Sequence, residues 1–396
     1  MTFSTTMMRS SPIIASQHWQ PSRRQAIAST TAAAAWASSS GNKIMASSAA
    51  TQAAELPVVP TAEIIPGLEI SRVVKGCWQL SGGHAGDRAT DRTSGKAAVQ
   101  DFQKFVEAGI TTFDTADIYG PSERIIGEYL SSLSPEASSK CQVLTKFCCF
   151  GDSMRQANKL DFVSKSINNS CSNLKSDTLD CVQFYWHDYS NKNYVDAALH
   201  LAELQSKGKI KAIGVTNFDV PRLAEMIDAG VPVVENQIQY SLLDTRPDNG
   251  MTKYCEEKNI RIVPYGTAAG RFLTDAYFGK KPADVSVNTY SLSKYGSVIS
   301  QRGGWEWYQD LLRVLRDVAT KHNVDIAEVS SRWVLQRPAV AAVILGARNA
   351  SHVDQHRKIF TFELDNDDLA KIEVALDTGI KPTSDVYSWE RGGRWA

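Results

Sequence analysis

The stretch TTFDTADIYGPSERIIGEYL, residues 111–130, contains the pattern that decides the fold. A short run of β-branched and aromatic residues ends at Asp114, and Tyr119 follows five residues later. Gly120 and Pro121 interrupt the chain, and apolar residues at helical spacing come next. The stretch therefore predicts a strand that ends on a carboxylate, a polar loop that carries a phenol, and then a helix.

The same alternation of strand and helix recurs along the chain. Candidate strands, several of them near-continuous apolar runs, lie at residues 72–80, 111–117, 141–147, 181–187, 210–218, 233–240, 260–266 and 340–347. Helix-length segments separate them, so we predict an α/β protein built as a closed (β/α)8 TIM barrel. A doubly wound open sheet is the alternative. It calls for a G-x-G-x-x-G turn after an early strand, and the sequence has none.

The first part of the chain differs in composition from the rest. Residues 1–54 contain no Asp or Glu, are rich in Ser, Thr and Ala, and carry Arg9, Arg23 and Arg24. This composition resembles an organelle transit peptide, and a disordered tail is the alternative. The Arg pair before an Ala-rich run also resembles a twin-arginine signal. We expect a targeting segment at 1–54, a barrel domain with a C-terminal tail over its cleft at 55–396, and a chloroplast location. Within the chloroplast we favour the stroma, with the thylakoid lumen as the alternative. The mitochondrion is the alternative organelle.

The overall composition gives no sign of a nucleic-acid partner or a membrane span. Lys+Arg and Asp+Glu both number 43, so there is no basic excess. No apolar run reaches the roughly 20 residues that a membrane helix needs. The seven cysteines are scattered without a C-x-x-C pair, which is typical of free thiols. We expect no metal site and no transmembrane segment.

In a barrel of this type, the active site collects polar side chains at the carboxyl ends of the strands. Nearly every predicted strand ends or continues in such a residue. In chain order they are Asp114, Tyr119, Lys146, His187, Thr216, Asn217, Asn236, Gln237, Tyr265 and Arg348.

Four of these residues could deliver a proton to a carbonyl group. The phenol of Tyr119 has an ordinary pKa of about 10, and a nearby ammonium from Lys146 would lower it. Asp114 would keep that lysine protonated, and His187 would donate to or orient the carbonyl oxygen. Reduction also needs a hydride, which no side chain supplies and a nicotinamide cofactor does.

A second group suits such a cofactor. The amides of Asn217 and Gln237 could bond a carboxamide, and Tyr265 could stack on the nicotinamide ring. Arg348 follows Gly346 closely, and a guanidinium is well suited to bind a phosphate.

The sequence resembles the aldo-keto reductase superfamily over most of residues 64–365. The stretches that carry the resemblance occur in the family's order. They are FDTADIYGPSERIIGEYL, VLTKF, FYWH, IKAIGVTNF, ENQIQYSLL, VPYGTAAGRFL and VILGARNASHV. The resemblance implies reduction of an aldehyde or ketone with NADP(H), or less commonly NAD(H), on a barrel without a Rossmann turn. It places the catalytic roles on Asp114, Tyr119, Lys146 and His187. It places the nicotinamide contacts on Thr216, Asn217, Gln237 and Tyr265.

The cofactor segment after the last strand departs from the family pattern. Many members have Gln and Asn one helical turn apart where this chain has His352 and His356. Gly346 and Arg348 still fit a 2′-phosphate and hence NADPH. We assign all four residues to cofactor binding and expect the adenine contacts to differ from those of the family.

The substrate pocket is less well defined by the sequence. Trp78 is either a core aromatic residue or a pocket wall, and we assign Trp389 to the pocket. The C-terminal segment, residues 384–396, is rich in aromatic residues. Its Tyr387, Trp389 and Trp395 cover the cleft or dock on a partner. The long stretch at 274–304 either folds over the site or is a loose insertion.

Two other functions compete with a reductase. One is an NADP(H)-binding regulatory module with little turnover. The other is a lyase that forms a Schiff base through Lys146, although a carboxylate beside that lysine disfavours the neutral amine that the reaction needs. The expected partner is a small-molecule carbonyl compound, and the sequence gives no oligomeric state.

Overall fold

The computed structural model describes residues 55–81 and 96–396. The predicted targeting segment, residues 1–54, lies outside the described residues, as does the segment 82–95. In the described part of the chain, no helix is long and apolar enough to cross a membrane.

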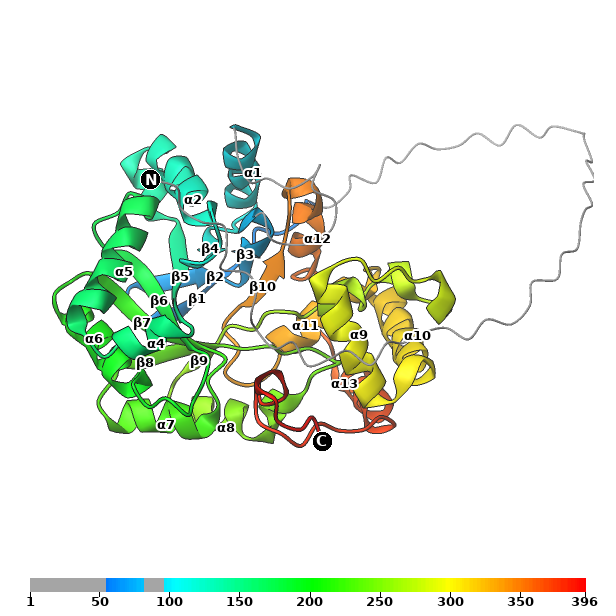
Figure 1. Cartoon of the computed structure of the whole chain (residues 1–396). Helices are drawn as coiled ribbons and strands as arrows, with labels where there is room; N and C mark the ends of the chain where they lie inside the picture. Colours follow the sequence, from blue (N-terminus) through cyan, green and yellow to red (C-terminus); the bar gives the residue numbers. More distant parts are fainter. Residues whose placement is uncertain (1–54, 82–95) are drawn as a thin grey trace, which may run out of the picture.

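A parallel sheet forms the centre of the molecule, and helices surround it (Figure 1). Its strands run in the order β10-β3-β4-β5-β6-β7-β8-β9. They are β3 (Val73–Gly76), β4 (Thr112–Asp114), β5 (Gln142–Cys149), β6 (Leu179–Trp186), β7 (Ile210–Thr216), β8 (Val233–Gln237), β9 (Arg261–Ile262) and β10 (Val343–Gly346). Parallel bridges between Ile262 and Val340 and between Tyr265 and Ile344 join the last strand to the first. The sheet is therefore closed, and the predicted (β/α)8 barrel is confirmed.

Each predicted strand overlaps one barrel strand. β5 continues to Cys149 and β6 begins at Leu179, beyond the predicted bounds, whereas β3, β4 and β9 are much shorter than expected. Residues 72–80 leave the sheet at Gly76, and Trp78–Ser81 form a 3-10 helix. In residues 260–266 only Arg261 and Ile262 form a strand, because Pro264 has no N–H to donate to the ladder.

The helices surround the sheet, and most of them bury apolar side chains on one face (Figure 1). They are α1 (Lys96–Glu107), α2 (Ser122–Ser132), α3 (Pro135–Ser139), α4 (Asp152–Gln156), α5 (Leu160–Leu174), α6 (Tyr194–Ser206), α7 (Val220–Asp228), α8 (Met251–Glu257), α9 (Tyr290–Arg302), α10 (Gly304–His322), α11 (Ile326–Leu335), α12 (Val353–Lys358) and α13 (Asn366–Asp377). Several begin at side-chain caps. Asp219 accepts from the N–H of Arg222 at the start of α7, and Asp325 and Glu328 form a capping box at α11.

A hairpin that the sequence analysis did not anticipate precedes the barrel. It pairs β1 (Thr61–Ile65) with β2 (Leu68–Ser71) in antiparallel register. Its side chains Ile64, Leu68 and Ile70 are buried against the inward-facing residues of the barrel strands. The hairpin thus supplies apolar side chains to the barrel interior.

The long segment at 274–304 is not a loose insertion. Thr289 caps α9 by accepting from the N–H of Leu292, and the helix buries Leu292, Tyr295, Val298 and Ile299. Figure 1 shows α9 beside α10, which in turn packs on α13. The segment is therefore part of the packed fold.

Two glycines in helix interiors should respond to alanine in opposite directions. A Cβ on Gly127 of α2 would lie 2.3 Å from the backbone oxygen of Asn173, whereas a Cβ on Gly296 of α9 would meet nothing closer than 3.8 Å. We expect Gly127→Ala to destabilise the protein by about 1–3 kcal/mol through overpacking. Gly296→Ala should stabilise it by up to about 1 kcal/mol through helix propensity. Urea unfolding measures both, and equal shifts of the same sign would contradict the helix contact.

Candidate active site

A buried ion pair occupies the carboxyl ends of β4 and β5. Asp114 is the last residue of β4, Lys146 lies in β5, and each is 4% exposed. The Lys146 ammonium donates to Asp114 Oδ2 and, over 2.9 Å, to the carbonyl oxygen of Thr115. It also lies 5.4 Å from the centroid of the Tyr119 ring. The structure therefore brings together three of the four predicted catalytic residues.

Tyr119 differs from the sequence-based expectation in its acidity. Burial raises its pKa well above the ordinary value, and the charge of Asp114 raises it further. The pKa of Tyr119 is therefore raised, and not lowered as the nearby Lys146 led us to expect, because burial has the largest effect. Tyr119 is consequently a protonated phenol throughout the neutral range, which suits a proton donor.

Gln237 is hydrogen-bonded to the buried pair. Its Nε2 donates to Asp114 Oδ2 over 2.7 Å and to Gln183 Oε1 over 2.9 Å. Gln183 is fully buried on β6 and was missed by the sequence analysis. The signal was present, because an amide within the apolar run CVQFYWH needs a partner inside the barrel.

A second carboxyl group lies deeper in the barrel. Glu235 of β8 is fully buried, and burial raises its pKa to about 8. The thiol of Cys181 lies 3.8 Å from its Oε1. A Cβ on Gly214 would meet the same oxygen at 1.9 Å, so that glycine makes the space. Glu235 is therefore mostly protonated at neutral pH and adds little charge beneath the ion pair.

On β6 the structure adds a residue to the predicted set. Strand alternation turns Tyr185 to the same face as Gln183, and Tyr185 is 6% exposed. Its hydroxyl is hydrogen-bonded to Nδ1 of His187 over 2.9 Å. His187 itself follows the end of the strand, and burial and the Arg391 charge lower its pKa. Tyr185 thus lies with His187 at the mouth of the barrel, which is the end formed by the carboxyl ends of the strands. The sequence analysis did not single it out.

The predicted nicotinamide contacts lie close together. Thr216 Oγ1 donates to the carbonyl oxygen of Gln237 over 3.2 Å, and the N–H of Asn217 donates to the same oxygen over 2.8 Å. Asn217 adopts a left-handed backbone with φ of 60°, which Asn tolerates better than most residues. Its Oδ1 accepts from the hydroxyl of Tyr265 over 3.0 Å. These contacts join the four residues, Gln237 through its backbone oxygen, at the carboxyl ends of β7 and β8.

The residues after β10 are spread over a longer path. Gly346 ends the strand and Arg348 is half-buried in the loop that follows. His352 is exposed, whereas His356 is buried on α12 with its ring 6.4 Å from that of Phe105. Burial, with the His352 charge, lowers the pKa of His356 to about 3. The two histidines therefore face different surroundings, and their cofactor role stays a prediction.

The two predicted pocket tryptophans are half-buried. Trp78 lies edge-on to Tyr290, with ring centroids 6.0 Å apart. Trp389 packs edge-on against Trp395 at 5.7 Å. These contacts leave their role as pocket walls a prediction.

The C-terminal segment is fastened to the ends of β6 and β7 by Arg391. Its guanidinium donates to three backbone carbonyl oxygens: Nη2 to Trp186 over 2.8 Å, Nη1 to Asn217 over 3.0 Å, and Nε to His187 over 3.2 Å. Tyr387, four residues before Arg391, has a left-handed backbone with φ of 57°. Its ring lies edge-on to that of Tyr185, with the ring centroids 6.4 Å apart. The segment therefore touches both predicted catalytic and predicted cofactor residues.

Glu390 provides a second attachment. Its carboxylate accepts from two nitrogens of Arg246, over 2.7 and 2.9 Å, and lies 3.3 Å from the ammonium of Lys294. Arg246 also pairs with the buried Asp244 over 2.6 Å. Lys294 comes from α9 and lies 5.7 Å from the ring centroid of Tyr265. One buried charge network thus joins the C-terminal segment, α9 and the mouth.

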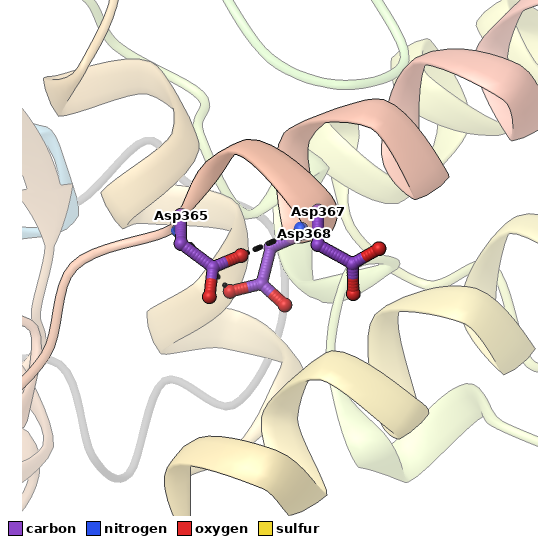
Figure 2. A group of neighbouring side chains, drawn as sticks. All are labelled: Asp365, Asp367 and Asp368. Carbon is purple, nitrogen blue, oxygen red and sulfur yellow. Dashed lines mark hydrogen bonds between the residues drawn. The ribbon is translucent and has the colours of Figure 1, made fainter.

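Figure 2 shows three neighbouring carboxylates at the start of α13, Asp365, Asp367 and Asp368. Each has a structural partner. Asp365 accepts from the N–H of Asp368 over 2.9 Å, Asp368 accepts from Lys321 over 2.8 Å, and Asp367 accepts from Lys371 over 2.7 Å. Helix capping and ion pairing account for this cluster.

The Glu390 attachment should be visible in acid stability. Burial opposes its charge, but Lys294 and Arg246 outweigh burial and lower the pKa of Glu390 from 4.5 to about 2. Its contribution is therefore complete above about pH 4.5 and is lost as the pH falls toward 2. We expect Glu390→Gln to lower the free energy of unfolding at pH 7 by about 3 kcal/mol and to flatten its decline in that window. Urea unfolding across pH 7 to 2 measures this.

Glu363 provides a matched control, because its carboxylate lies 2.6 Å from Arg332 but is 82% exposed. Glu363→Gln should cost less than about 1 kcal/mol. An equal effect of the two substitutions would refute the buried network.

Comparisons with known proteins agree with this geometry. The sequence model of the Aldo/keto reductase family matches residues 72–377. A pyridoxal reductase, chloroplastic, of Arabidopsis thaliana is 25% identical over 297 residues, which cover 71% of this chain and 77% of the relative. An NADPH-dependent codeinone reductase of Papaver somniferum is 27% identical over 292 residues, covering 68% and 78%. The solved structure of a glycerol dehydrogenase from Gluconobacter oxydans superposes with a TM-score of 0.68 at 24% identity, covering 81% of this chain and 96% of that one. The chain belongs to the aldo/keto reductase family, and it is an oxidoreductase.

Proposed function

We propose that the protein reduces an aldehyde or ketone to an alcohol with NADPH, and that Tyr119 donates the proton. The observation that carries the proposal is the protonated Tyr119 phenol beside the buried Lys146–Asp114 pair. Hydride transfer to a carbonyl carbon leaves an alkoxide that needs a proton at once. A phenol with a fixed cation behind it meets that need, because the ammonium stabilises the phenolate left after transfer.

The residues on the cofactor side fit a nicotinamide dinucleotide. When bound, such a cofactor supplies the hydride. Asn217 and Gln237 would hold the carboxamide, and Tyr265, oriented by its bond to Asn217, would face the ring. Arg348 would bind the 2′-phosphate. These assignments favour NADPH over NADH, and the name of the Papaver relative agrees with that preference.

Tyr185 and His187 would position the carbonyl group. The two side chains are hydrogen-bonded to each other, and Arg391 holds the backbone of His187. Because the pKa of His187 is lowered, its ring is neutral near pH 7 and offers one N–H. Together with Tyr119, the pair would surround a carbonyl oxygen with neutral donors.

The two competing functions are less well supported. A Schiff base needs Lys146 as a neutral amine, yet its nitrogen donates to Asp114 and to Thr115 O in the barrel interior. A regulatory module would keep the nucleotide site and lack turnover. The intact arrangement of Asp114, Tyr119 and Lys146 favours the enzyme.

A chloroplast location, in the stroma, accords with the proposed cofactor. It is supported by the acid-free, Ser-rich composition of residues 1–54, and the name of the Arabidopsis relative is consistent with it. The stroma is preferred to the lumen because the proposed reaction needs a supply of NADPH.

The substrate side of the mouth is aromatic. The ring of Phe150 lies 5.1 Å from that of Tyr185 and 5.4 Å from that of His187, and Phe150 is 41% exposed. Ile118, adjacent to Tyr119, is 54% exposed. Apolar surface beside the proton donor favours a carbonyl compound with an apolar or aromatic body over a sugar.

Removing the phenol should stop the chemistry and spare cofactor binding. We expect Tyr119→Phe to lower kcat/KM for aldehyde reduction by about 100-fold or more, because general acid catalysis is lost. NADPH affinity, followed by fluorescence quenching, should stay within about twofold of the wild type. Wild-type protein that binds NADPH but reduces no member of an aldehyde and ketone panel would instead indicate the regulatory module.

The aromatic wall should decide between substrates. We expect Phe150→Ala to lower kcat/KM for benzaldehyde by about tenfold and to leave that for glyceraldehyde nearly unchanged, since only an aromatic body gains from the ring. Phe278→Ala is the control, because Phe278 is 40% exposed and follows the 3-10 helix Asp275–Tyr277, which contributes none of the proposed site residues. Equal losses for both aldehydes would contradict an apolar pocket.

A further inference from the structure

Lys75 is a buried lysine outside the site described above. It lies on β3 and is 2% exposed, between two phenylalanine rings of α1. Its ammonium is 4.8 Å from the ring centroid of Phe102 and 5.0 Å from that of Phe105. It donates to the carbonyl oxygen of Ala347 over 3.3 Å and contacts the sulfur of Cys77 at 3.9 Å. Within residues 55–81 and 96–396, no carboxylate lies within ion-pair distance of it.

Packing alone does not explain a lysine at this position. A buried charge is costly unless it is paired, and among the described residues the contacts of the Lys75 ammonium are one carbonyl, a thiol and two ring faces. Lys146, by contrast, is buried with the carboxylate of Asp114. An unbranched apolar side chain would fill the space between Phe102 and Phe105 without that cost. The stability of the packing between β3 and α1 therefore does not account for the ammonium of Lys75.

In the part of the chain that the structure describes, the backbone group that accepts from the ammonium is the carbonyl of Ala347. β10 ends at Gly346, so the sheet no longer fixes the peptide that joins Ala347 to Arg348. A trans peptide is planar, and its C=O and N–H point in opposite directions. With the Ala347 oxygen turned inward onto Lys75, the N–H of Arg348 is turned away from the interior. A cation on the carbonyl also polarises the peptide and strengthens that N–H as a donor.

We propose that Lys75 is a positioning residue of the nucleotide-binding loop, which orients the Ala347–Arg348 peptide for the 2′-phosphate of NADPH. This inference rests on the proposed function, because it takes Arg348 as the phosphate ligand. On this inference, the free energy lost by burying the ammonium is offset by tighter binding of the cofactor. Lys75 acts through Ala347 and touches neither the substrate nor the reacting atoms.

The test measures the affinity for NADPH and the thermal stability of the same Lys75 variant. We expect the affinity to fall and the stability to stay the same or rise. Lys75→Met keeps the shape of the side chain and removes the ammonium. We expect the dissociation constant for NADPH to rise about tenfold, which corresponds to about 1.4 kcal/mol. The dissociation constant for NADH should change less than threefold, because NADH lacks the 2′-phosphate. The thermal unfolding midpoint should stay the same or rise, because the variant removes a buried cation that has no carboxylate partner among the described residues.

Two further variants serve as controls. Cys77→Ala removes the other polar contact of the ammonium and should leave NADPH affinity unchanged. Arg348→Ala should weaken NADPH at least as much as Lys75→Met. Lys75→Leu provides a second apolar side chain if the methionine variant does not fold, and binding is scored in whichever variant keeps the wild-type near-UV circular dichroism.

The outcomes distinguish this inference from the proposed function. Unchanged NADPH affinity in a folded Lys75 variant overturns the positioning role. So does an equal loss for NADPH and NADH together with a lowered unfolding midpoint, which would mean that Lys75 is structural. If the wild-type protein binds neither nucleotide, the proposed function fails first, and the role of Lys75 fails with it.

Discussion

The ion pair between Lys146 and Asp114 is the constraint on which the rest of the site depends. Two charges buried at the end of a barrel are tolerated only if their remaining hydrogen-bonding groups are satisfied. Thr115 and Gln237 supply those bonds, and Gln183 continues them along β6. The pair in turn fixes a cation beside Tyr119. The polar interior of the upper barrel therefore follows from the requirement to bury one lysine.

The C-terminal segment extends this arrangement to the mouth. Arg391 binds the carbonyl oxygens that terminate two neighbouring strands, so the same guanidinium steadies the backbone of His187 and of Asn217. Glu390 ties the segment to Arg246 and to Lys294 of α9. Substrate-side and cofactor-side groups thus share a support that lies far from both in the sequence.

The strand pattern predicted the barrel well, because parallel strands covered on both faces are apolar and nearly continuous. The carboxyl-end rule then brought Asp114, Lys146 and Tyr119 together. The hairpin at 61–71 was missed because it alternates only weakly and lies outside the eight repeats. The acidity of Tyr119 was misjudged because the sequence does not show how deeply the phenol is buried, and burial is the main cause of its raised pKa.

The partner of His187 could not be foreseen for a related reason. Which face of β6 points inward depends on register, and Tyr185 becomes a mouth residue only once Gln183 is known to lie inside. The contacts of Arg391, between residues some two hundred positions apart, leave no trace in local patterns. Long-range polar contacts of this kind are decided by the closed fold.

The barrel is not bonded evenly around its circumference. β5, β6 and β7 share long ladders, whereas β9 has two residues and meets β10 mainly through isolated bridges at Ile262 and Tyr265. The strand pairing is therefore sparsest in the part of the wall that runs from β8 through β9, β10 and β3 to β4. That sector carries both Tyr265 and the loop to Arg348. The most easily deformed part of the barrel wall is therefore the side on which a long dinucleotide would bind and dissociate.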